Sequence, residues 1–119
     1  MSPHAALHLL GLSNLVAGAL VAWAPPLVLA SADGVHSTSA RLLGGSLAIM
    51  LVAAGSAGWF VPAAARRPHL WIFGVVVKVA AALLWGWTAL ATGLSMLAAG
   101  AAADLAVAVA IAGILRASR

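Results

Sequence analysis

The stretch from Pro68 to Ala103 holds a single residue that is fully charged at neutral pH, Lys78, and is otherwise mostly alanine, valine, leucine and glycine. The whole chain has only 119 residues, of which 65% are hydrophobic and 7% are charged. Ordinary soluble domains have roughly a quarter of their residues charged, so a soluble core of this size could not bury so much apolar surface. The sequence therefore predicts a small integral membrane protein with one domain.

Four apolar segments are long enough for a spanning helix, which needs about 20 residues. Prolines, glycines and capping residues place them at about 5–24, 41–61, 69–90 and 96–115. Because the connections are short, sequential helices should be antiparallel neighbours. The predicted fold is all-α: an up-down-up-down four-helix bundle, with residues 1–119 forming one transmembrane domain.

The basic residues are divided unequally between the two sides of the predicted membrane. The side with both termini carries four, and the other side carries Arg41, which Asp33 offsets. By the positive-inside rule we expect both termini in the cytoplasm and the protein in a bacterial inner (plasma) membrane. The N-terminal stretch lacks the basic cluster of a signal peptide, so we expect it to be retained as the first helix. The four basic residues are Arg66, Arg67, Arg116 and Arg119.

Three polar residues fall near the middle of their predicted helices: Asn14 in the first, Lys78 in the third and Asp104 in the fourth. An unpaired charge at the bilayer centre costs at least about 2.5–3.5 kcal/mol, so pairing of Lys78 with Asp104 is expected. We interpret this buried polar layer as structural, with Asn14 as an extra hydrogen-bonding group. The alternative is a site that carries protons or ions, because intramembrane carboxylates often serve in such relays.

Arg41 begins the second helix near the face opposite the termini. An arginine there is expected to extend its head group to the interface. The alternative interpretation is a contact with an anionic lipid head group or a quinone carbonyl.

The histidines form a weak metal or haem pattern. His4 and His8 have i, i+4 spacing, and His69 lies on the same predicted side of the membrane. Because they lie at helix ends, we interpret them as interfacial polar residues, and Asp33 with His36 lacks a third ligand. With no cysteine in the chain, thiolate sites are excluded. The sequence predicts neither a metal nor a cofactor.

No catalytic pattern is found. The sequence offers no arguable Ser-His-Asp arrangement, no pair of carboxylates within reach and no phosphate-binding loop. A basic helix face with stacked aromatics, which would favour nucleic-acid binding, is also missing. We therefore expect a protein that is not an enzyme and does not bind nucleic acid.

One combination resembles a known group. Residues 41–45 (RLLGG) open the second helix, Lys78 is central in the third and Asp104 is central in the fourth. This resembles small uncharacterised bacterial membrane proteins that are loosely similar to the DoxX-like four-helix group. It departs from DoxX itself, whose first-helix arginine pattern is not found in this chain. The resemblance implies a four-helix fold.

Small residues on the second and fourth helices favour close packing against another chain. Ala54, Gly58 and Ala99 are the predicted interface residues. We expect a non-catalytic subunit or accessory protein of a larger membrane complex, whose partners are the lipid bilayer and other membrane protein chains. Two alternatives remain open: a small oligomeric ion- or proton-coupled transporter, and a redox subunit that contacts quinone or haem.

Overall fold

A computed structural model describes residues 2–23, 38–93 and 95–118. Within these residues every regular element is a helix, so the all-α prediction is confirmed for the part of the chain described. Two long helices form the first half of the chain: α1 (Pro3–Trp23) and α3 (Thr38–Ala57), which the short 3-10 turn η1 (Gly58–Phe60) extends. Pro62 follows that turn, where a proline removes a backbone donor and favours the end of a helix.

The third long helix is composite. It begins with the 3-10 turn η2 (Ala63–Ala65) and the short helix α4 (Arg66–His69), and then continues through η3 (Leu70–Val76) into α5 (Val77–Thr92). Segment η3 is a π-helix, in which the N–H of Val77 donates to the carbonyl of Ile72 five residues earlier. Such wide turns are rare and are often found at functional sites. Here the wide turns come directly before Lys78.

A tight turn joins α5 to the last helix, α6 (Ser95–Ala117). Gly93 ends α5 in the left-handed conformation, with a φ of 71°, and its N–H donates to the carbonyl of Ala89 at 2.8 Å. A glycine adopts this backbone conformation without a steric penalty from a Cβ atom. The sequence therefore specifies an antiparallel α5–α6 hairpin.

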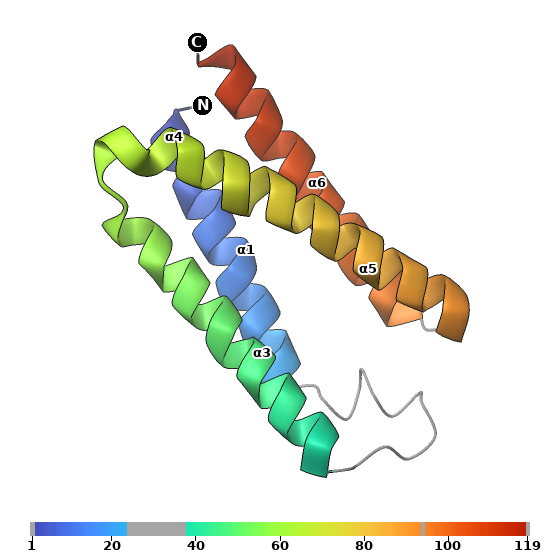
Figure 1. Ribbon diagram of the computed structural model, residues 1–119. Coiled ribbons are helices and arrows are strands. Elements are labelled where there is room, and N and C mark those ends of the chain that lie inside the picture. The colour runs from blue at the N-terminus through green and yellow to red at the C-terminus, as the bar shows by residue number, and fades with distance from the viewer. Residues whose placement is uncertain (1, 24–37, 94, 119) are drawn as a thin grey trace.

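The helices are arranged as two antiparallel pairs, α1 with α3 and α5 with α6 (Figure 1). The pairs contact each other at the end where both termini lie, and they diverge toward the opposite end (Figure 1). The main contacts between the pairs are made by α1, which meets α4, η3 and α6. The molecule is 49 Å long.

The buried core lies at the end where the two pairs meet. It is built from the first turns of α1, the start of η3 and the last turns of α6, which come together because α1 runs away from this end and α6 returns to it. Leu70, Ile111 and Leu115 are its largest fully buried side chains. The core consists of Ala6, Leu7, Leu10, Leu70, Ile111, Ile114 and Leu115.

Large apolar side chains cover the outer faces of the helices. Ile49 and Leu90, for example, are 72% and 85% exposed. Soluble monomers rarely expose so much apolar surface, whereas a protein surrounded by lipid is expected to do so. Three helical stretches in the described residues are long and apolar enough to cross a membrane: Pro3–Val21, Ala63–Ala91 and Ser95–Ala117.

The second predicted crossing, at 41–61, corresponds to α3 with η1. Its apolar stretch in the described part of the chain, Ser46–Phe60, is shorter than the other three, so this crossing stays a prediction. The other predicted helices, 5–24, 69–90 and 96–115, correspond to α1, to the run from α4 to α5, and to α6. Asp33 and His36, interpreted from the sequence as an incomplete metal site, lie outside the described residues.

Candidate functional site

Lys78 and Asp104 form an ion pair between α5 and α6. The Nζ atom of Lys78 donates to Oδ1 of Asp104 at 2.6 Å. The lysine side chain is 7% exposed and that of the aspartate is 20% exposed. A short, charge-assisted bond of this kind is one of the stronger hydrogen bonds in proteins. The two charges therefore meet, as expected of central charges in adjacent apolar helices.

Small residues one turn away on each helix make room for this contact. Gly74 and Ala82, four residues on either side of Lys78, are both buried, and so is Ala108, four residues after Asp104. A Cβ atom added at Gly74 would lie 2.9 Å from Cδ1 of Ile111. The close approach of the two helices lets a lysine and an aspartate meet without displacing large side chains.

The pair does not use all of its hydrogen-bonding capacity. A lysine ammonium has three donors and a carboxylate has two acceptor oxygens. Within the described residues, the ammonium of Lys78 makes one hydrogen bond, to Asp104, and Oδ2 of Asp104 makes none. Two donors and one acceptor oxygen therefore have no partner among the residues that the structure describes.

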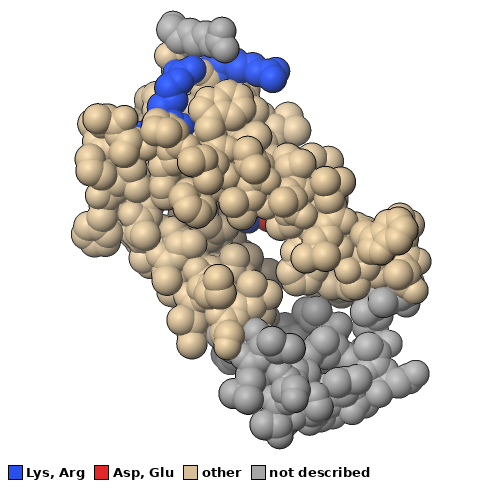
Figure 2. Space-filling view, viewed as in Figure 1, with Lys and Arg blue, Asp and Glu red and all other residues tan. Residues whose placement is uncertain are grey.

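The pair lies at the edge of a hollow between the two helix pairs. Figure 2 shows the helix pairs as two lobes with an open space between them, and a small red and blue patch is visible at its edge. The red colour marks an acidic side chain, and Asp104 is the acidic residue in the described ranges. We refer to this space as the inter-pair hollow.

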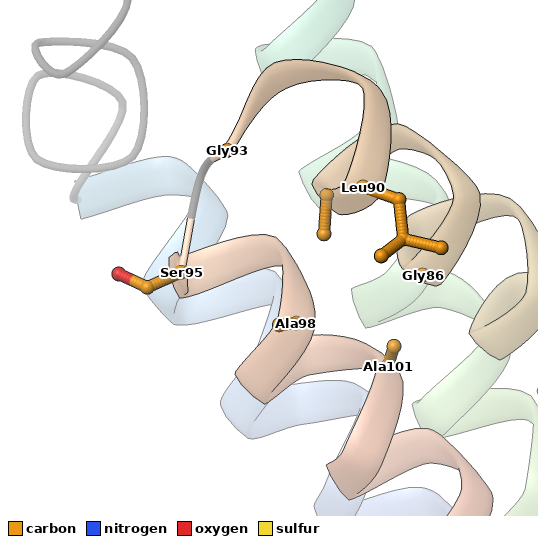
Figure 3. Close-up of a pocket in the computed structure, with 7 residues that line it drawn as sticks. Gly86, Leu90, Gly93, Ser95, Ala98 and Ala101 are labelled. Atoms are coloured by element: carbon orange, nitrogen blue, oxygen red, sulfur yellow. The ribbon is translucent and has the colours of Figure 1, made fainter.

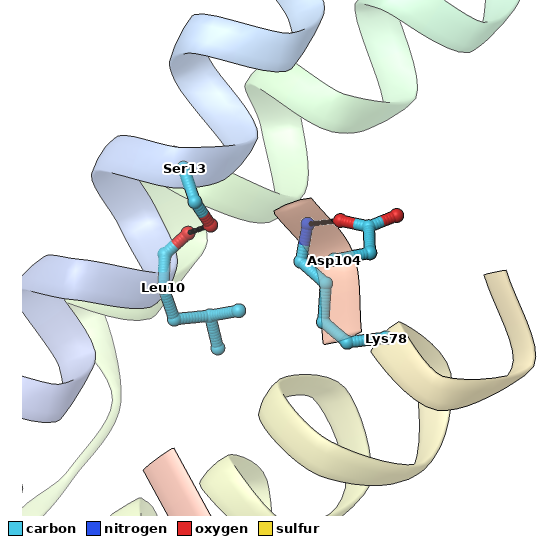
Figure 4. Close-up of polar contacts among 4 residues, drawn as sticks. All are labelled: Leu10, Ser13, Lys78 and Asp104. Atoms are coloured by element: carbon cyan, nitrogen blue, oxygen red, sulfur yellow. Dashed lines mark hydrogen bonds and ion pairs between the residues drawn. The ribbon is translucent and has the colours of Figure 1, made fainter. Parts of the chain in front are cut away.

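Ser13 lies on the side of α1 that faces the ion pair (Figure 4). Its hydroxyl donates to the carbonyl of Leu10 at 2.9 Å. Asn14, the residue predicted to join the pair, is buried instead where α1 meets α3. Its Cβ atom would lie 3.3 Å from a Cβ atom added at Gly55 of α3. No hydrogen bond links Asn14 to Lys78 or Asp104 in the described part of the chain.

The basic end of the molecule is held together by arginines. Figure 2 shows basic side chains gathered at the end where the termini lie. Nη2 of Arg67 donates to the carbonyl of Leu115 at 2.8 Å, and Nε of Arg66 donates to the carbonyl of Val61 at 3.4 Å. The last carbonyls of a helix lack partners within it, and a cation there also interacts favourably with the helix dipole. Arg67 thus caps α6.

A second polar cluster joins α1 to η1. Nε1 of Trp59 donates to Nδ1 of His8 at 3.1 Å, and Nε2 of His8 lies 3.1 Å from Nε2 of His4. His69 is separate and packs against Phe73, with ring centroids 4.8 Å apart. Among the described residues, no group of three or more His, Cys, Asp or Glu side chains is placed to share a metal ion.

The predicted packing residues have different environments. Ala54 and Ala99 are exposed, whereas Gly58 is buried. A Cβ atom added at Gly58 would meet no heavy atom within 4 Å. Arg41 lies in α3, but its side chain is outside the described residues, so its lipid or quinone contact stays a prediction.

An open apolar depression lies between α5 and α6 at the end away from the termini (Figure 3). Its lining is small and almost entirely apolar, with the Ser95 hydroxyl pointing away from it (Figure 3). Such a lining offers no group for catalysis. The depression is lined by Gly86, Leu90, Gly93, Ser95, Ala98 and Ala101, with Ala89.

Comparison with known protein families, with curated proteins and with solved structures finds no match for this chain.

Proposed function

We propose that this protein is a small, non-catalytic subunit of a larger membrane complex, and that the inter-pair hollow receives a transmembrane helix of a different polypeptide. The observation that carries the proposal is the Lys78–Asp104 pair. It is buried between α5 and α6 and lies at the edge of the hollow, and among the described residues two donors and one acceptor oxygen of the pair have no partner.

Lipid tails cannot use this remaining capacity. A polar group in hydrocarbon without a hydrogen-bond partner is costly, and charged groups inside membranes turn toward protein or water for this reason. A helix with a hydroxyl or carboxamide side chain at the same depth fits the pair. Such a group can accept from Nζ of Lys78 and donate to Oδ2 of Asp104.

The exposed small residues support the same assembly. Transmembrane helices associate through close backbone approach and polar contacts rather than through hydrophobic burial. Ala54 on α3 and Ala99 on α6 are exposed, and each would let a neighbouring helix come close. Further helices of the same complex can pack at these two exposed positions, while the helix in the hollow makes hydrogen bonds with the ion pair.

Native gel electrophoresis in mild detergent, with mass spectrometry of co-purifying chains, tests the proposal. The wild type should migrate in an assembly larger than its own mass. The double variant Lys78→Leu/Asp104→Leu removes both charges together and should fold while leaving the assembly. Val109→Leu, at a 65% exposed position on the same helix α6, is the matched control and should stay in the assembly.

The absence of cysteine allows a direct measurement of proximity. A Ser13→Cys variant carrying a photoreactive label should crosslink to one co-purifying chain from the hollow, and the crosslink should be lost when Lys78 and Asp104 are both leucine. Val109→Cys should not give that crosslink. The subunit function would be contradicted by a stable monomer with no co-purifying chain. It would also be contradicted by a crosslink that persists when Lys78 and Asp104 are both leucine.

A transporter is the second candidate, and the 20% exposure of the Asp104 side chain at the hollow favours it. A carboxylate accessible from such a space can exchange an ion or a proton. Asp104→Asn decides between the two functions in proteoliposomes. Loss of a pH-gradient-dependent flux in a folded variant supports transport, whereas wild-type protein without any flux excludes it.

A further inference from the structure

His4 and His8 place two ring nitrogens side by side on the solvent-exposed face of the first turns of α1. Their Nε2 atoms are 3.1 Å apart, their ring centroids are 4.6 Å apart, and the rings are almost perpendicular at 83°. Both residues are exposed. The spacing i, i+4 brings the two side chains onto one helix face.

The bond from Trp59 determines which nitrogens carry protons. An indole N–H can only donate, so Nδ1 of His8 accepts from Trp59 and carries no proton. A neutral imidazole has one N–H, which for His8 is then at Nε2. That N–H donates to Nε2 of His4, which leaves the proton of His4 on Nδ1.

We propose that His4 and His8 form a two-histidine binding site for a divalent transition-metal ion. Imidazole nitrogens bind such ions at about 2.0–2.1 Å, so two of them on one ion lie about 2.9 Å apart at a right angle and about 3.3 Å apart in a tetrahedron. The observed 3.1 Å falls between these values. Histidine pairs with this spacing on one helix face are established metal ligands.

The ligand set favours Cu²⁺, followed by Ni²⁺ and Zn²⁺. Imidazole suits all three ions, and the affinity of a given nitrogen site is highest for Cu²⁺. Two adjacent nitrogens near a right angle also fit the tetragonal geometry of Cu²⁺ and Ni²⁺. The exposed position leaves the remaining coordination positions to water. Hard oxygen-seeking ions such as Mg²⁺ and Ca²⁺ have no carboxylate here among the described residues.

Metal binding must break the bond between His8 and Trp59. Both Nε2 atoms must be free of protons to bind the ion, so the proton of His8 moves from Nε2 to Nδ1. Nδ1 then carries an N–H and cannot accept from Nε1 of Trp59. Because the Trp59 side chain is half exposed, at 50%, the indole can turn away. The metal and Trp59 therefore compete for His8.

Isothermal titration calorimetry tests the site on untagged full-length protein in detergent, with Cu²⁺ as the probe in a non-coordinating buffer. The wild type should bind one Cu²⁺, and electron paramagnetic resonance should show nitrogen ligands. His4→Ala and His8→Ala should each weaken binding at least about ten-fold, since even residues that only support metal ligands are worth 10–100-fold. His69→Ala is the matched control and should bind like the wild type.

Trp59→Phe separates this site from adventitious binding. It keeps an aromatic ring but removes the donor that holds His8 in the tautomer with its proton on Nε2, which cannot bind the metal through that atom. Trp59→Phe should therefore tighten Cu²⁺ binding a few-fold. The proposal is overturned if His4→Ala/His8→Ala binds Cu²⁺ as tightly as the wild type. Unchanged or weaker binding by Trp59→Phe would overturn the competition between the metal and the indole.

Discussion

Gly11 and Gly55 meet backbone to backbone between α1 and α3. A Cβ atom added at Gly55 would lie 2.9 Å from the carbonyl oxygen of Gly11, and one added at Gly11 would lie 3.1 Å from that of Gly55. Real Cβ atoms almost never show the shorter distance and seldom show the longer one, and a backbone cannot move aside as a side chain can. The close approach of α1 and α3 therefore requires glycine at both positions.

Gly55→Ala should destabilise the α1–α3 pair by about 1–3 kcal/mol, the usual cost of overpacking. Gly113→Ala is the matched control, because a Cβ atom at that position of α6 meets no heavy atom within 4 Å. The control should be neutral or more stable by up to about 1 kcal/mol, since alanine favours the helix over glycine. Unfolding by SDS in mixed micelles measures both. Equal stability of the two variants would contradict the close approach.

Removal of one member of the Lys78–Asp104 pair should destabilise the protein more than removal of both. Lys78→Leu or Asp104→Leu leaves an uncompensated buried charge and should cost about 3–5 kcal/mol, whereas the double variant should be milder. The same SDS titration gives the coupling between the two residues. If the double variant is as unstable as the worse single variant, the pair is not what stabilises this contact.

Arg67→Ala should lower the free energy of unfolding by about 1 kcal/mol, because the half-buried guanidinium loses its hydrogen bond to the Leu115 carbonyl. The loss is moderate since the Ser118 hydroxyl also donates to that carbonyl, at 3.4 Å. Arg116→Ala is the control: it removes the same charge at the same helix end from an exposed side chain and should have little effect. A similar loss in both variants would indicate a general charge effect.

Both termini should be cytoplasmic, because the four basic residues of the sequence pattern lie toward that side. Reporter fusions at Met1 and Arg119 measure this in cells. The structure adds that the N-terminal end of α1 and the C-terminal end of α6 lie at the same end of the molecule (Figure 1). Periplasmic activity from either fusion would therefore reverse the whole orientation.

Gly58→Leu and Ala99→Leu should release the protein from its complex without unfolding it. A Cβ atom at Gly58 meets no heavy atom within 4 Å and Ala99 is exposed, so neither change begins with a clash at the Cβ atom. Ala54→Leu at an exposed position of α3 should act in the same way. Size-exclusion chromatography with the SDS titration distinguishes release from unfolding. Variants that stay in the assembly would remove these residues from its interface.

The sequence predicted the Lys78–Asp104 contact because depth along a helix can be counted from its ends. Two central charges on helices joined by a short turn have few other partners, and the structure pairs them at 2.6 Å. The rotation of α1 could not be counted in the same way. Neighbouring residues of a helix differ by about 100° in direction, as 3.6 residues make one turn. Ser13 therefore faces the pair, while Asn14 is buried where α1 meets α3.

The bond between Trp59 and His8 could not be predicted, because it joins residues 51 positions apart through the packing of α1 against η1. The histidine spacing was visible in the sequence, but the indole that determines the tautomer of His8 was not connected to it. The divergence of the two helix pairs was also hidden. Apolar periodicity shows that a helix has a buried face, but it does not show how far along its length that face is covered.

Because the described parts of the two helix pairs meet near the termini and diverge from there, they have the mechanics of a hinge. The core around Leu70, Ile111 and Leu115 is the pivot, and the diverging ends of the pairs are the arms. For a given rotation at the pivot, displacement grows with distance along each arm, and hinges of this kind convert small local changes into large separations. A substitution at Ile111 that alters the packing by a fraction of an ångström would therefore be felt most strongly far away, at the turn beside Gly93.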